Sequence, residues 1–128
     1  MKRFSVIFLS LIIPITASAA VFQAASGDDE LFTVSVPIQD DLYVAGGLVH
    51  VNEMVGGDLI IAGGEVSVSG DVSQDLIAAG GSIDVKGKVL DDVRAAGGEI
   101  DIEGMVGDDL IIAGGNIRVA KDAIIEGD

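Results

Sequence analysis

Apolar and polar residues alternate along most of the chain, and glycines interrupt the alternation at regular intervals. In the block DLIIAGGEVSVSGDVSQ, which begins at Asp58, positions 2, 4, 9, 11 and 15 are aliphatic. Alternation over short runs broken by glycine is typical of strand–turn–strand structure, and helical spacing is not seen. The pattern therefore predicts three short strands per block, with the five aliphatic side chains pointing inward.

The block recurs with a constant 17-residue period. The triplet A-G-G occurs at residues 45–47, 62–64, 79–81, 96–98 and 113–115, and each block begins with an aspartate: Asp41, Asp58, Asp75, Asp92 and Asp109. A fixed short period indicates a solenoid. We therefore predict an all-β, single-stranded β-helix of about five to six coils, stacked about 4.8 Å apart. The Gly-Gly pair is expected to supply a positive φ at one corner.

The first 20 residues are predicted to be a signal peptide. Lys2 and Arg3 form a basic start, residues 4–15 are mostly apolar, and residues 17–19 (ASA) match the small-x-small pattern of a cleavage site. We expect cleavage after Ala19 or Ala20; the alternative, an uncleaved anchor, is disfavoured because a membrane span needs roughly 18 apolar residues. The sequence thus predicts an exported protein, periplasmic or extracellular, at the envelope of a bacterial-type cell.

The N-terminal end of the repeat is degenerate. Phe32, Val34 and Ile38 occupy inward positions of an irregular block that begins near Ala24. Residues 21–40 are therefore predicted to be a linker and a partial cap coil, and residues 41–128 the β-helix of five repeats.

The C-terminal end is irregular in another way. The interval from Asp109 to Asp128 is longer than the regular period, which predicts a two-residue insertion near Lys121 and Asp122. A solenoid normally ends in an atypical capping repeat with a polar outer face, and none follows here. We therefore expect the sequence to be truncated, with the chain continuing past Asp128 into further coils or membrane helices.

Composition narrows the function classes. The chain has 128 residues, with 21 acidic and 7 basic side chains and a net charge of −14, which excludes a basic nucleic-acid-binding surface. At 49% hydrophobic residues it is too apolar for a disordered acidic tail. With no cysteine, the chain has no disulfide, thiolate metal site or cysteine nucleophile.

Residues 85–110 (VKGKVLDDVRAAGGEIDIEGMVGDDL) resemble bactofilins, the bacterial polymer-forming cytoskeletal proteins. The shared elements are residues 85–89 (VKGKV) and 93–95 (VRA), and the resemblance covers roughly residues 32–128. It implies a right-handed β-helix that polymerises end to end without nucleotide and serves as a scaffold for envelope or cell-shape machinery. Cytoskeletal bactofilins lack the export signal, and their corner is less uniform than the A-G-G corner here. In these two features the chain looks closer to exported polymer-forming proteins, which often continue into C-terminal membrane helices.

Self-association is also expected on physical grounds. The end coil of a β-helix presents unpaired backbone groups and an open aliphatic core, and such an edge is a template for another copy. The alternative is a capped monomer or module. The residues expected to mediate end-on stacking are Phe32, Val34 and Ile38 at one end and Ile117, Val119 and Ile125 at the other.

The outward position 3 of each block offers a lateral contact. This position is largely apolar, and such an exposed ridge suggests a partner surface; the alternative is a strongly twisted strand that half-buries it. The residues are Tyr43, Ile60, Ile77, Arg94 and Ile111.

The five block-initial aspartates form a column in the predicted fold, with Asp40, Asp91 and Asp108 beside it. The favoured interpretation is structural, with each carboxylate accepting backbone N–H bonds in the turn before its strand. The alternative is calcium, a hard cation that takes several oxygen ligands, although the glycine-rich nonapeptide of calcium-binding β-rolls is absent.

Enzymatic signals are weak. His50 is the only histidine and lies at an outward position without a nucleophile or acid at a diagnostic spacing. Paired acids such as Asp91 and Asp92 suit glycoside chemistry, but the coils have no loops to build a groove. The sequence therefore predicts a non-enzymatic, cofactor-free structural protein whose main partner is itself. Membrane or envelope proteins are further candidate partners, through a missing C-terminal segment. The alternative is an exported β-solenoid module that binds calcium or glycans.

Overall fold

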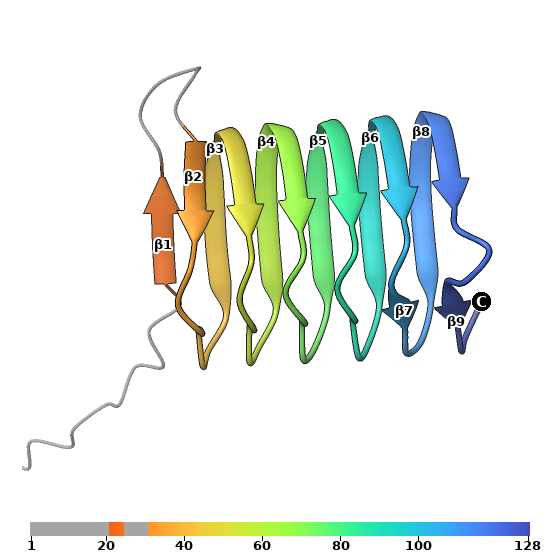
Figure 1. The fold of residues 1–128 in the computed structure, drawn as a ribbon, viewed down its shortest axis with the longest axis horizontal. Helices are drawn as coiled ribbons and strands as arrows, with labels where there is room; N and C mark the ends of the chain where they lie inside the picture. The colour runs from red at the N-terminus through yellow and green to blue at the C-terminus, as the bar shows by residue number, and fades with distance from the viewer. Residues whose placement is uncertain (1–20, 25–30) are drawn as a thin grey trace, which may run out of the picture.

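The chain forms a β-solenoid. The computed structural model describes residues 21–24 and 31–128, so the predicted signal peptide lies outside the described residues. All paired strands in these ranges run parallel and stack along one axis, in about six turns (Figure 1). The predicted all-β solenoid is confirmed. None of the described residues belongs to a helix long and apolar enough to cross a membrane.

Five long strands form the body of the solenoid. Each pairs with the next at a constant 17-residue offset, as in Leu42↔Leu59 and Leu59↔Leu76. The predicted 17-residue coil is thus confirmed at the level of strand register. The strands are β3 (Leu42–Val51), β4 (Leu59–Val68), β5 (Leu76–Val85), β6 (Val93–Ile102) and β8 (Leu110–Val119).

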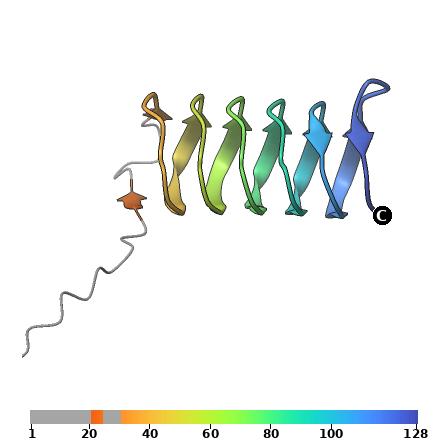
Figure 2. The same cartoon turned by 90° about the horizontal axis from the view of Figure 1, so that it is seen from below.

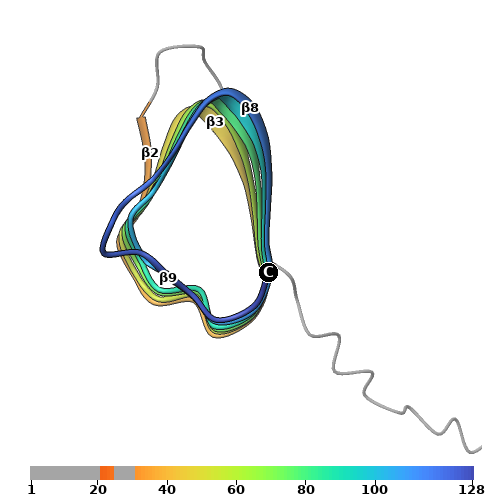
Figure 3. The same cartoon turned by 90° about the vertical axis from the view of Figure 1, so that its right-hand side faces the viewer.

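Each coil has three paired sides, although only one long strand is continuous. In β3 and β4 the register runs to Gly46↔Gly63, skips the second glycine, and resumes at Leu48↔Glu65. We call residues 42–46 and their equivalents the first side, and residues 48–51 and their equivalents the second side. The third side is a single bridge per coil, such as Val55↔Val72, or a two-residue strand. Figure 3 shows the resulting outline end-on.

The Gly-Gly corner needs glycine because neighbouring coils approach closely there, and the expectation of a positive φ was wrong. Neither Gly63 nor Gly64 has a φ in the left-handed range. A Cβ on Gly63 would lie 2.6 Å from the carbonyl oxygen of Gly46 in the preceding coil, and the same clash recurs at Gly80 and Gly97. The strand bends at this corner without a left-handed residue, and glycine provides room for the stacking.

Aliphatic side chains fill the interior. The predicted inward positions of the middle coils are buried, including Leu59, Ile61, Val66, Val68 and Val72, and no polar or charged residue of the described chain is buried. Fully burying such a side chain contributes about 1.5–3 kcal/mol. Because every coil repeats the same positions, like residues stack on like along the axis.

The first coil is built from two short strands. β2 (Leu31–Val34) pairs with β3 at the 17-residue offset, as in Phe32↔Val49, so these residues add a partial coil at the N-terminal end. β1 (Val21–Ala24) covers the first side of β3, with Val21 opposite Leu42. The sequence pattern did not anticipate β1, because the offset between these two strands is longer than the repeat.

The last coil contains the predicted two-residue insertion. β6 and β8 pair with the regular offset, as in Ile102↔Val119, whereas the partners in β7 (Met105–Val106) and β9 (Ile124–Ile125) are two positions further apart in the sequence. The extra residues lie in a turn closed by a 3.0 Å bond from Ala123 N to Ala120 O. The enlarged loop protrudes beyond the outline of the other coils (Figures 2 and 3).

Candidate functional site

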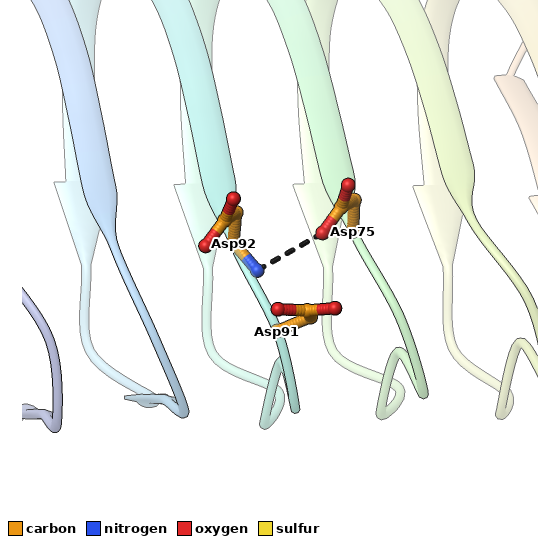
Figure 4. A group of neighbouring side chains, drawn as sticks. All are labelled: Asp75, Asp91 and Asp92. Carbon is orange, nitrogen blue, oxygen red and sulfur yellow. Dashed lines mark hydrogen bonds between the residues drawn. The ribbon is translucent and has the colours of Figure 1, made fainter.

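The block-initial aspartates form a hydrogen-bonded ladder along one corner of the solenoid. The N–H of each aspartate donates to Oδ1 of the aspartate in the preceding coil; Figure 4 shows one such rung. The N···Oδ1 distances are 2.8 Å for Asp58 to Asp41, 3.0 Å for Asp75 to Asp58, 3.1 Å for Asp92 to Asp75, and 3.0 Å for both Asp109 to Asp92 and Asp128 to Asp109.

The ladder explains why aspartate is repeated at this position. The carbonyl of Asp75 accepts a 2.9 Å bond from the N–H of Leu59 in the preceding coil, so the strand begins its regular pairing there. The N–H of the same residue points across the turn, and the carboxylate of Asp58 supplies its acceptor. The structural interpretation is thus confirmed with one change: the accepted N–H belongs to the next coil and not to the residue's own turn.

A second acidic column lies beside the ladder in three coils, at Asp40, Asp91 and Asp108. Asp91 and Asp108 directly precede Asp92 and Asp109, and both are exposed. Partial loss of hydration, followed by the negative charges of Asp75 and Asp92, raises the pKa of Asp91. The charge of Asp109, followed by partial loss of hydration, raises the pKa of Asp108. The two columns therefore repel, most strongly where both positions are acidic.

Two groups of carboxylates are close enough to hold one cation each. One carboxylate oxygen from each of Asp75, Asp91 and Asp92 lies within 4.8 Å of the others, and the same holds for Asp92, Asp108 and Asp109. Figure 4 shows that Asp91 reaches toward the two ladder residues from the adjoining turn.

The first two of the five aspartates considered for calcium, Asp41 and Asp58, belong to neither group. The residues that precede Asp58 and Asp75 are Gly57 and Gln74, so no second acid joins the ladder in those coils. The only described carboxylate groups that could hold a calcium ion are therefore the two that contain Asp92.

Asp92 is already occupied on both oxygens. Its Oδ1 accepts the N–H of Asp109, and its Oδ2 pairs with Nη2 of Arg94 at 3.1 Å. A cation shared with Asp75 and Asp91 would compete with the guanidinium of Arg94. Exposed acidic groups with such internal partners can hold a hard cation, but they are not preorganised for one.

The two ends of the solenoid differ in how far their aliphatic residues are covered. At the N-terminal end Val34 is buried, and Phe32 and Ile38 are half-buried. At the C-terminal end Ile117 is 44% and Val119 41% exposed, and Ile125 is half-buried. The predicted stacking residues therefore lie in the two terminal coils, and the C-terminal group is the more open.

The second side of the coils carries an ion pair that the sequence reasoning missed. The guanidinium of Arg118 in β8 makes two bonds to Asp101 in β6, with Nε–Oδ1 at 2.5 Å and Nη2–Oδ2 at 2.9 Å. The side-chain hydrogen bond and the charge of Asp101 raise the pKa of Arg118. The 17-residue spacing of the two residues was the available signal, because it places them side by side.

His50 lies on the same second side, half-buried. Its register partners are Thr33 in β2 and Ser67 in β4. In the described part of the chain, no hydrogen bond connects His50 to either hydroxyl.

Position 3 of the coils is partly covered. Tyr43 and Ile60 are half-buried, whereas Ile77 and Ile111 are 41% and 58% exposed. The exposed ridge considered from the sequence is therefore present in the C-terminal half of the solenoid.

Comparison with family models, with curated proteins and with solved structures gave no match for this chain.

Proposed function

We propose that this protein is an exported, non-enzymatic structural protein that assembles end to end into a polymer at the cell envelope, in the manner of the bactofilins it resembles. The observation that carries the proposal is the constant 17-residue parallel register of the stacked coils, in which the edge of one coil is the template for the next. In the last described coil the core side chains are open. Ile117 and Val119 are 44% and 41% exposed, whereas their counterparts one coil earlier, Ile100 and Ile102, are completely buried. A second copy stacked on this end would bury them.

Backbone hydrogen bonding favours the same contact. In the interior, each coil bonds to the next through its main chain; for example, the N–H of Ser69 donates to the carbonyl of Val51 at 2.8 Å. At the edge of β8 the equivalent groups have no following strand within the described residues. Exposed strand edges of this kind template pairing with another chain, and the contact adds both hydrogen bonds and apolar burial.

The proposed export is supported by the position of the first strand. β1 begins at Val21, directly after the predicted cleavage site at Ala19 or Ala20. Removal of Lys2 and Arg3 would leave an even more acidic chain than the net charge of −14. Copies of such a chain repel one another at long range, so assembly through apolar ends should strengthen with salt.

Cation binding at the acidic corner is a second candidate function. The observation in its favour is the pair of three-carboxylate groups around Asp92. Against it, the ladder oxygens accept backbone N–H bonds that stabilise the coil without any ion. Assembly and cation binding make different predictions, because end-on stacking through apolar side chains needs no metal.

The test is electron microscopy of the protein expressed from its full sequence, in chelator and in millimolar calcium. We expect filaments in both. Ile117→Asp places a charge on the open end and should abolish them. The matched control is Met54→Asp, because Met54 is exposed and lies in the first full coil, far from the C-terminal end, and the equivalent position of the next coil is already Asp71.

Each result has a clear meaning. Filaments in chelator that persist in Met54→Asp and vanish in Ile117→Asp support end-on assembly. Monomers in chelator that assemble only with calcium would favour the cation-binding candidate. Monomers under all conditions would overturn the proposed polymer. Circular dichroism of Ile117→Asp tests whether the coils of this variant are still folded.

A further inference from the structure

The outward face of the first side carries two columns of side chains and no carboxylate. Position 3 contributes a ridge of larger side chains and position 5 a groove of alanines. A shallow depression of about 350 Å³ lies between them, and its lining is almost entirely apolar. We call this surface the aliphatic face; its outward lining residues are Ile77, Ala79, Arg94, Ala96, Ile111 and Ala113.

Charge distinguishes the aliphatic face from the rest of the molecule. The chain has 21 acidic residues, but none of them occupies position 3 or 5 of any coil. The ladder corner lies on one side of the face, and the second side carries acids such as Glu65 and Glu99. Arg94 is the single charged residue on the face, and it pairs with Asp92. Two copies of this acidic chain can therefore approach each other most closely through the aliphatic face.

We propose that the aliphatic face pairs two copies of the chain laterally within the polymer. This inference rests on the proposed end-to-end assembly and adds a second contact to it. The occupant of the face is the same face of another copy.

The shape of the face fits a twofold pair. Alternate residues on one side of a strand are about 7 Å apart, so the isoleucine ridge and the alanine groove run as two parallel columns. A twofold axis that lies between the columns, parallel to the solenoid axis, places the ridge of each copy opposite the groove of the other. In the end-on view the strands of this side shift steadily from β3 to β8 (Figure 3), so the two columns twist gently together along the axis. The two solenoids of such a pair run in the same direction.

The size of the face explains why pairing should accompany polymerisation. Five coils at a spacing of about 4.8 Å and a width of about three residues give on the order of 200–300 Å² per copy. A stable interface buries about 800 Å² per partner. A single copy is therefore too small to dimerise through this face, whereas a filament repeats the face along its length and sums the contacts.

The test compares filaments of the wild-type chain with two variants that add the same charge to the same coil. Ala79→Glu places a carboxylate in the alanine groove of the face. Ser82→Glu is the control, because Ser82 lies on the second side between Glu65 and Glu99 in register. The measurement is mass per length by scanning transmission electron microscopy. The whole chain is 13.0 kDa, and without the predicted signal peptide about 11 kDa remain. With six coils about 4.8 Å apart, a single filament then has about 4 kDa per nm and a paired one about twice that.

We expect paired filaments for the wild type and Ser82→Glu, and single filaments for Ala79→Glu. Single wild-type filaments would overturn lateral pairing and leave end-on assembly intact. Equal loss of pairing in both variants would overturn the assignment to this face. Absence of any polymer would overturn both proposals. A further outcome is that wild-type filaments are single and float with phosphatidylcholine vesicles, whereas Ala79→Glu filaments do not float. This result would identify a lipid surface as the occupant of the face and overturn the proposal that a second copy occupies it.

Discussion

The backbone N–H of Asp92 donates to Oδ1 of Asp75 in the preceding coil, at 3.1 Å. The bond joins two residues one repeat apart and recurs at every coil boundary from Asp41 to Asp128. The carboxylate takes the place of a main-chain acceptor where the turn directs an N–H away from the regular ladder. Like charges are thus brought together because each one satisfies a backbone donor of its neighbour.

Two substitutions of Asp75 distinguish the effect of its charge on stability from the effect of the hydrogen bond that its carboxylate accepts. Asp75→Ala leaves the N–H of Asp92 without its partner in a partly buried turn, and should lower the free energy of unfolding by about 1–3 kcal/mol. Asp75→Asn removes the same charge but keeps an Oδ1 acceptor, so its loss should be clearly smaller. Urea denaturation followed by circular dichroism measures both. Equal losses in the two variants would show that the hydrogen bond is not what the aspartate contributes.

The two glycines of one corner should tolerate alanine to different degrees. A Cβ on Gly63 would lie 2.6 Å from the Gly46 carbonyl oxygen, so the coil must shift, whereas a Cβ on Gly64 would lie 3.1 Å from the Gly47 carbonyl oxygen. Because forced contacts in a packed structure cost about 1–3 kcal/mol, Gly63→Ala should be the more destabilising. Thermal unfolding of the two variants measures the difference. A larger loss for Gly64→Ala would contradict the close-approach explanation.

The repeat period was sufficient to predict the coil, the inward residues and the insertion before Ile124, because stacking forces equivalent residues into equivalent positions. It did not predict β1, whose pairing of Val21 with Leu42 breaks the period. The role of the glycine corner was also predicted wrongly. Glycine is required both where coils approach closely and where φ is positive, so the sequence alone does not distinguish the two reasons.

The candidate sites were predictable to different degrees. The column of aspartates followed from the repeat, but the direction of each bond depends on the turn geometry, which alternation does not specify. The pair Arg118–Asp101 could have been found from its spacing. The grouping of Asp91 with Asp75 and Asp92 depends on how the turn folds back, and only the structure shows it.

Export predicts a defined N-terminus. When the full sequence is expressed in a bacterium and the protein is recovered from outside the cytoplasm, its intact mass should correspond to a chain that begins at Ala20 or Val21. Replacement of both Ala17 and Ala19 by lysine should block processing, because a signal peptidase reads small residues there. Recovery of the exported wild-type chain with residues 1–20 attached would contradict cleavage and favour a membrane anchor.

Stability should rise as the pH falls from neutral toward the mildly acidic range. The pKa values of Asp91 and Asp108 are raised in the folded state above the ordinary value of 3.8. Between that value and the raised ones the folded chain holds more protons than the unfolded chain, so the free energy of unfolding decreases as the pH increases through this window. Above this window both carboxylates are charged and their repulsion is fully present. Asp91→Asn and Asp108→Asn should therefore raise the melting temperature at pH 7 and flatten its dependence on pH, as measured by thermal unfolding across pH 4–7.

The control for this series is Asp122→Asn, which removes the same charge from an exposed residue of the insertion, away from the acidic corner. It should leave the pH dependence as in the wild type, because the general repulsion of an acidic chain acts on all its carboxylates whereas the raised pKa values arise from close neighbours. A similar flattening in all three variants would assign the effect to net charge. A melting temperature that falls in Asp91→Asn at pH 7 would show instead that this carboxylate stabilises the corner, as it would if it held a cation with Asp75 and Asp92.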